Sequence, residues 1–148
     1  MRAFVLAAGL GVRMGPLGEE VPKALLPLGG VAMVEFTLSR LAGAGVSEAV
    51  VNLHHRADAI RKHLGDSFRG VTLHYSHEPE ILGTAGGLKK VEAFLREGEG
   101  PFFVLNADVV SEADLEAAMV HHRSGGYLAT LILREAADAK KFGVLAVD

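Results

Sequence analysis

Short, nearly continuous apolar runs alternate along the chain with segments whose apolar residues recur at helical spacing. The runs predict strands over 3–8, 46–53, 101–106 and 127–135, of which those at 3–8 and 101–106 are buried, and one more strand beginning at 142. Alternating apolar residues predict a further strand over 71–76. The segments between them predict helices over 31–45, 56–65, 83–97 and 111–126. Alternating strands and helices are typical of an α/β fold, a Rossmann-like, mostly parallel sheet with helices on both faces. Ligands of such sheets bind beyond the carboxyl ends of the strands.

Two of these helices carry additional signals. Leu88, Val91 and Leu95 fall on one face of a single helix over 83–97. Ser111 and Asp114 have the spacing of a capping box, which predicts that the fourth helix begins near Ser111.

Composition excludes several classes of protein. A chain of 148 residues with 49% hydrophobic residues is long enough for one globular domain with its own core. The formal net charge of -3 argues against a general nucleic-acid-binding surface. The absence of cysteine excludes a disulfide scaffold and suits a reducing, cytoplasmic setting. No apolar run is long enough for a membrane span or reads as a signal peptide, so we expect no membrane association.

The segment from Leu6 to Gly30 follows the first strand and is rich in glycine and proline. Its glycine spacing differs from the dinucleotide-binding fingerprint, the second strand lacks the terminal acid of that fold, and no Walker lysine follows. Its prolines exclude a continuous helix. What remains is a long glycine loop with two cations, Arg13 and Lys23, and such a loop predicts a phosphate-binding site.

Four motifs then agree with one family. LAAGLGVRMGPL…PKALLPLGG at 6–30, EPEILGTAGGL at 78–88, PFFVLNADVV at 101–110 and KKFGVLAVD at 140–148 together resemble the sugar-phosphate nucleotidylyltransferases. Within that family the motif sequences are most similar to those of the mannose-1-phosphate guanylyltransferases. The resemblance implies a glycosyltransferase-A-like nucleotidyltransferase fold, with residues 1–148 as its N-terminal, nucleotide-binding part. Val12 and Gly18 depart from the pattern, because the family usually has threonine at both positions.

The resemblance also implies a reaction and a site. A nucleotidyl group passes from a nucleoside triphosphate to a sugar 1-phosphate, giving a nucleotide-sugar and pyrophosphate. Arg13 and Lys23 are the implied catalytic cations, and Asp108 is the implied ligand of a Mg2+ cofactor. The residues implied to bind the nucleotide are Leu6, Ala8, Gly9, Gly11, Glu78, Gly83 and Thr84, and those implied to contact the sugar phosphate are Asn106 and Gly143.

Glu78 bears on the choice of nucleotide. A carboxylate only accepts hydrogen bonds, and guanine offers two adjacent donors, its N1–H and its 2-amino group, so Glu78 favours GTP. The alternative interpretation is an exposed loop acid without a role in binding.

The sequence also bears on other functional interpretations. The seven histidines show no metal-ligand spacing. A molybdopterin-cofactor nucleotidyltransferase shares the R-M-G of the loop but would not be expected to carry LGTAGGL. A uridylyl- or thymidylyltransferase acting on another sugar 1-phosphate, and a non-catalytic nucleotide-binding regulatory subunit, both stay open.

The motifs end before the family pattern does. The sugar-phosphate segment and a second metal-binding aspartate of the family have no match here, so the chain reads as truncated at its C-terminus. We therefore expect the 148 residues alone to be inactive. The expected partners are the nucleoside triphosphate and the sugar 1-phosphate. The sequence is also compatible with a homo-oligomer.

Overall fold

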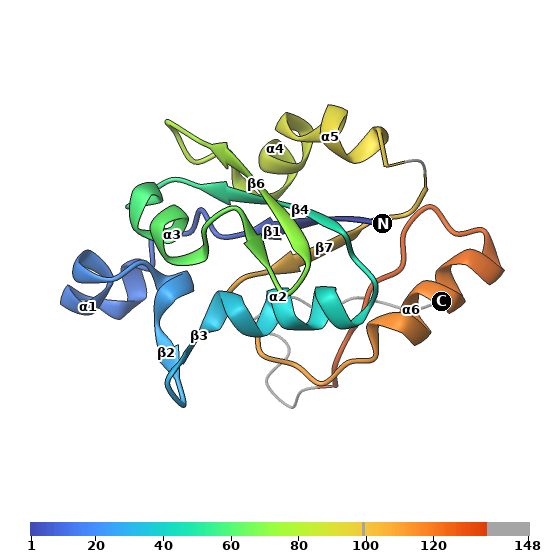
Figure 1. The fold of residues 1–148 in the computed structure, drawn as a ribbon, viewed down its shortest axis with the longest axis horizontal. Helices are drawn as coiled ribbons and strands as arrows, with labels where there is room; N and C mark the ends of the chain where they lie inside the picture. The colour runs from blue at the N-terminus through green and yellow to red at the C-terminus, as the bar shows by residue number, and fades with distance from the viewer. Residues whose placement is uncertain (99, 136–148) are drawn as a thin grey trace. The chain divides into compact units, whose positions relative to one another are not determined.

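β1 (Arg2–Leu6) is an inner strand of a five-stranded sheet with the order β5-β6-β4-β1-β7 (Figure 1). The computed structural model describes residues 1–98 and 100–135, without the side chains of residues 13 and 19, and divides the chain into compact units of 1–115 and 116–148. The sheet belongs to the first unit. β4 (Glu48–Leu53), β6 (Val71–His77) and β7 (Phe103–Asn106) are parallel to β1, and only the short edge strand β5 (Ser67–Phe68) is antiparallel. The predicted α/β class and mostly parallel sheet are confirmed.

The order of the strands reverses at β1. The chain moves from β1 to β4 and β6 on one side and then returns to place β7 on the other side of β1. The carboxyl ends of β1 and β7 therefore flank a topological switch point, where parallel sheets form their ligand-binding crevice.

Helices cover both faces of the sheet, as predicted (Figure 1). Phe4 and Val50 face α4 (Gly83–Lys90) and α5 (Glu92–Arg96), where they pack in one buried cluster with Val91 and Leu95. α2 (Met33–Gly43) lies on the opposite face and buries Val34, Leu38 and Leu41. α3 (Ala57–Leu64) connects β4 to β6 and buries Ile60 and Leu64.

The glycine loop forms no continuous helix, as its prolines predict. It contains the 3-10 turns η1 (Val12–Met14) and η2 (Lys23–Leu25), the short helix α1 (Pro16–Glu20), and a small hairpin of β2 (Pro27–Leu28) and β3 (Val31–Ala32). Gly18, one of the two departures from the family pattern, packs closely here. A Cβ atom at Gly18 would lie 2.9 Å from the carbonyl oxygen of Gly11, so threonine does not fit this arrangement of the loop.

The predicted helix over 83–97 is instead two helices. Val91 separates α4 from α5, with φ -99° and ψ 12°. Val91 is buried in one cluster with Phe4 and Val50, and a β-branched residue has only modest helix propensity.

Two predictions near the end of the described chain were wrong. α6 (Leu115–Gly125) begins four residues after Ser111, because the Ser111 hydroxyl accepts a hydrogen bond from the Ala113 N–H (3.3 Å) and makes a local turn instead of a helix cap. Residues 127–135 form no strand, since no described strand pairs with them, and Leu128 and Leu131 are exposed. The strand predicted from 142 lies outside the described residues. None of the helices in the described ranges is long and apolar enough to cross a membrane.

Candidate active site

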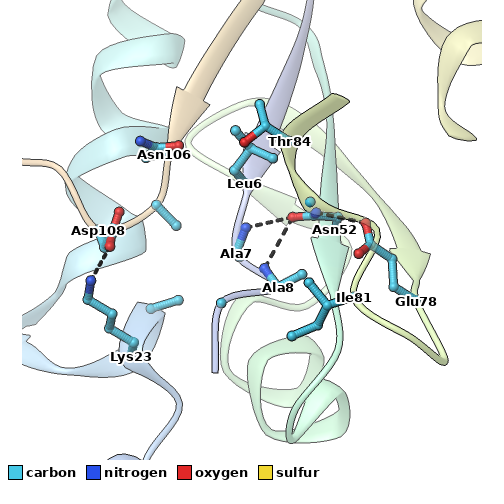
Figure 2. A pocket seen from close by; sticks show the side chains of 14 residues that line it. Leu6, Ala7, Ala8, Lys23, Asn52, Glu78, Ile81, Thr84, Asn106 and Asp108 are labelled. Atoms are coloured by element: carbon cyan, nitrogen blue, oxygen red, sulfur yellow. Dashed lines mark hydrogen bonds and ion pairs between the residues drawn. The ribbon is translucent and has the colours of Figure 1, made fainter. Parts of the chain in front are cut away.

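A cavity of about 250 Å³ opens at the carboxyl ends of β1 and β7, at the switch point (Figure 2). It is lined by most of the residues that the sequence singled out: Leu6, Ala8, Gly9, Lys23, Glu78, Gly83, Thr84, Asn106 and Asp108. Five further residues complete the lining: Ala7, Ala24, Asn52, Ile81 and Ala107. Segments far apart in the sequence therefore converge on one site.

Lys23 and Asp108 form an ion pair at one end of the cavity (Figure 2). The 3-10 turn η2 carries Lys23, and buried Ala24 anchors this turn. Asp108 follows β7. The Ala107 N–H donates to the Leu6 carbonyl oxygen (3.0 Å) and so extends the pairing with β1 to the residue before Asp108. Each charged side chain is 32% exposed, so both remain accessible to a ligand.

Asn106 lies beside this charged end (Figure 2). The hydroxyl of buried Thr37, on α2, donates to the Asn106 carbonyl oxygen (3.1 Å) and holds the end of β7 in place. The Asn106 side chain is exposed and free to face the cavity.

Asn52 and Glu78 form a buried hydrogen-bonded pair at the other end of the cavity (Figure 2). The Asn52 Oδ1 accepts hydrogen bonds from the N–H groups of Ala7 (2.6 Å) and Ala8 (3.2 Å), where the glycine loop begins. The Asn52 Nδ2 donates to the Glu78 Oε1 (2.8 Å), and the Leu82 N–H donates to the Glu78 Oε2 (3.1 Å). The pair thus ties the loop to the segment that leads into α4.

The interpretation of Glu78 as an exposed loop acid is wrong. Its side chain is 1% exposed, and each of its carboxylate oxygens already accepts a hydrogen bond from the protein. Its predicted contact with guanine stays a prediction.

Glycines of α4 fit closely around this pair. A Cβ atom at Gly87 would lie 2.9 Å from the Glu78 Oε1 and 3.1 Å from the Asn52 Nδ2, so only glycine fits there without displacing the pair. Gly83, the first residue of α4, has φ +68° and supplies the turn into the helix next to the cavity.

Three predicted site residues are not placed in the cavity. Gly11 lies in the loop but does not line it. The side chain of Arg13 and the whole of Gly143 lie outside the described part of the structure. Asn52 is the residue that sequence reasoning missed, although a polar residue at the end of the apolar run VVNL was a visible signal.

A family model described as nucleotidyl transferase matches residues 2–148. The chain belongs to this nucleotidyl transferase family. A mannose-1-phosphate guanyltransferase of Neurospora crassa is 35% identical over 98% of this chain, and a probable mannose-1-phosphate guanylyltransferase 1 of Oryza sativa is 35% identical over all of it. The chain spans about 40% of the length of these curated relatives.

Solved structures agree with the nucleotidyl transferase fold. HddC from Yersinia pseudotuberculosis, complexed with GMP-PN, superposes with a TM-score of 0.70 at 24% identity, over 82% of this chain and 53% of HddC. A UDP-glucose pyrophosphorylase complexed with UDP-glucose superposes with a TM-score of 0.71 at 17% identity, over 84% of this chain and 54% of the other. At these identities the match concerns the fold alone.

The cavity offers few metal ligands. Within residues 1–98 and 100–135, no three histidine or acidic side chains come together as a metal site. Asp108 provides one accessible carboxylate beside the cavity. A single carboxylate fits Mg2+, which keeps several waters and readily takes further oxygen ligands from phosphates.

Proposed function

We propose that this chain forms the nucleotide-binding part of an enzyme that transfers a nucleotidyl group from a nucleoside triphosphate to a sugar 1-phosphate. The products are a nucleotide-sugar and pyrophosphate. One observation carries the proposal: the glycine loop, Lys23 and Asp108 converge on a single cavity at the switch point of the sheet.

The chemistry suits the charged end of the cavity. A phosphate oxygen of the sugar 1-phosphate attacks the α-phosphorus of the triphosphate, a new P–O bond forms, and the bond to the leaving pyrophosphate breaks. The attacking oxygen is already anionic, so the site needs no general base. It needs fixed positive charge that brings two polyanions together and stabilises the transition state. Lys23 supplies such a charge, Arg13 is the second candidate, and Mg2+ held by Asp108 would neutralise charge on the phosphates.

GTP and mannose 1-phosphate are the substrates we propose. The support comes from the curated relatives, which are about 35% identical along nearly the whole chain and carry the name mannose-1-phosphate guanyltransferase or guanylyltransferase. The charged end of the cavity would take the phosphates, and the end at Asn52 and Ile81, which holds no accessible charge, would take the base.

Nucleotide binding tests the proposal most directly. Calorimetric titration of the protein with GTP, UTP, dTTP and ATP, each with and without Mg2+, should give the tightest binding for GTP with Mg2+. Tightest binding of UTP or dTTP would point to a uridylyl- or thymidylyltransferase. Binding without pyrophosphate release by the full natural chain would point to a regulatory subunit, and no binding at all would reject the proposal.

A further inference from the structure

The orientation of the Asn52 amide is determined by its surroundings. Two backbone N–H groups, of Ala7 and Ala8, point at one end of this amide, so that end must be the oxygen. Its NH2 group must then face Glu78. Asn52 is 2% exposed, so water cannot satisfy the reversed arrangement.

Glu78 must in turn accept hydrogen bonds at both of its oxygens. One oxygen faces the Asn52 NH2 group, and the other faces the Leu82 N–H. A glutamine would place its own NH2 group against one of these two donors. Leaving the buried Asn52 donor unpaired in this way costs about 1–3 kcal/mol, and the partly buried Leu82 N–H would otherwise have to find another acceptor. The local donor pattern therefore favours a carboxylate over an amide at position 78.

The pair connects two segments that line the cavity. Asn52 holds Ala7 and Ala8 at the start of the glycine loop, and Glu78 holds Leu82 directly before Gly83 and Thr84. Gly87 packs against the pair from α4 and leaves no room for a shift. Any change in the pair therefore alters the distance between the glycine loop and the first turn of α4.

We propose that Asn52 and Glu78 are positioning residues for the nucleotide. The pair fixes the glycine loop against the start of α4 and so sets the shape of the uncharged end of the cavity. This inference rests on the proposed function. Because the Glu78 carboxylate is engaged inside the protein, discrimination between bases falls to the groups it places, in the segment from Ile81 to Thr84.

An exchange of the two functional groups tests this inference. In Asn52→Asp the new carboxylate still accepts from Ala7 and Ala8 but faces the carboxylate of Glu78. In Glu78→Gln either the buried Asn52 amide or the partly buried Leu82 N–H loses its acceptor. In the double variant the new amide donates to the new carboxylate and still accepts from the Leu82 N–H. The double variant keeps the net charge of the pair, and Glu80→Gln, at an exposed acid two residues away, is the matched control.

The affinities for GTP, UTP, dTTP and ATP and the thermal unfolding are measured for the full natural chain and for all four variants. Each single variant should bind GTP about tenfold more weakly or worse, from the cost of an unpaired buried group. The double variant should bind GTP with an affinity within about threefold of that of the unchanged protein, because its donors and acceptors are paired again. In Asn52→Asp alone, affinity should recover as the pH falls, because two adjacent carboxylates then share a proton.

The outcomes separate the two proposals. A double variant as poor as the worse single variant, or one that fails to fold, overturns the positioning role. A double variant that binds all four nucleotides equally well overturns it too, because Glu78 would then read guanine directly. If the unchanged protein binds no nucleotide, the proposed function itself fails.

Discussion

Lys23 pairs with Asp108 across the charged end of the cavity, so the proposed phosphate-binding cation neutralises the proposed metal ligand. Under the proposed function, a triphosphate with Mg2+ would compete for both partners, since phosphate oxygens attract the lysine and the cation attracts the carboxylate. Before the ligand binds, the ion pair keeps the two opposite charges in place.

Asp108→Asn should separate the two roles of this ion pair. Without the carboxylate, Lys23 is free, and the phosphate site loses one negative charge that would repel phosphate. A partly exposed ion pair is worth roughly 0.2–1 kcal/mol, so GTP affinity without metal should rise by about 1.4- to fivefold. The additional affinity gained with Mg2+ should disappear, because its carboxylate ligand is gone. Calorimetry with and without Mg2+ measures both effects.

The control for that variant is Glu112→Gln, which removes an exposed carboxylate four residues away. Glu112→Gln should change neither the GTP affinity without metal nor the additional affinity gained with Mg2+. A similar rise in metal-free affinity for Glu112→Gln would assign the effect to overall charge rather than to the ion pair.

Lys23→Ala should weaken GTP binding strongly while leaving the fold intact, because the lysine is one-third exposed and acts on phosphate rather than on the core. Loss of a charge-assisted contact is worth about 1.5–3 kcal/mol, or roughly 10- to 150-fold in affinity. Arg13→Ala should have an effect of the same order. Lys62→Ala, at an exposed lysine on α3, is the matched control. Unchanged GTP affinity in both Lys23→Ala and Arg13→Ala would remove the loop from the proposed site.

Gly87→Ala should destabilise the protein although alanine is the better helix former. The added methyl group would lie 2.9 Å from the Glu78 Oε1 and 3.2 Å from the Phe4 Cζ, in a fully packed region. Overpacking of this kind costs about 1–3 kcal/mol, more than the roughly 1 kcal/mol that helix propensity returns. Gly43→Ala, at an exposed helical glycine with open space around it, should be neutral or stabilising. Chemical denaturation of both variants checks this, and equal stabilities would contradict the packing described.

Much of this fold could be predicted from the sequence because strong periodicity reflects burial. The runs at β1 and β4 are apolar since these inner parallel strands are covered on both faces, whereas β6 alternates because its side chains are alternately buried and exposed. Both patterns, and the apolar run at β7, predicted the strand positions to within a few residues. Residues 127–135 are equally apolar but form no strand, because a strand also needs a partner, which local sequence does not show. The break at Val91 likewise lies inside a continuous helical pattern of apolar residues, so the sequence predicted one helix there.

The candidate site could likewise be predicted from the sequence only in part. Lys23 and Asp108 could be found from motifs, because charged residues in loops after strands have few structural roles. Asn52 could not, since its importance depends on hydrogen bonds to Ala7 and Glu78, at 45 and 26 positions away in the chain. The registers of β4 beside β1 and beside β6 bring these groups together.

Tyr75 predicts a pH dependence of stability. Burial, and next the nearby Asp66 carboxylate, raise the pKa of Tyr75 above its ordinary value, against a smaller opposing effect of Arg61. A pKa that is higher in the folded than in the unfolded state favours the neutral phenol on folding. Its contribution is therefore complete below about pH 10 and is lost as the pH rises through the folded pKa. Tyr75→Phe should show a flatter decline of stability above this pH in alkaline denaturation, and an identical decline would contradict this origin.

The final prediction concerns turnover by the 148 residues alone. Lys23, Asp108 and the glycine loop lie around one described cavity, so these residues should suffice for nucleotide binding. The chain nevertheless spans about 40% of the length of its curated relatives, and of the residues we expect to meet an acceptor phosphate, the described cavity includes Lys23 and Asn106. Positioning of the acceptor supplies much of the rate in phosphoryl transfer. The 148 residues should therefore bind GTP weakly and release no pyrophosphate above background with mannose 1-phosphate, whereas a form of the protein as long as the relatives should turn over. A coupled pyrophosphate assay on the two forms, at equal concentration and with Mg2+, measures this difference. Comparable turnover by both would show that the acceptor site lies entirely within these residues.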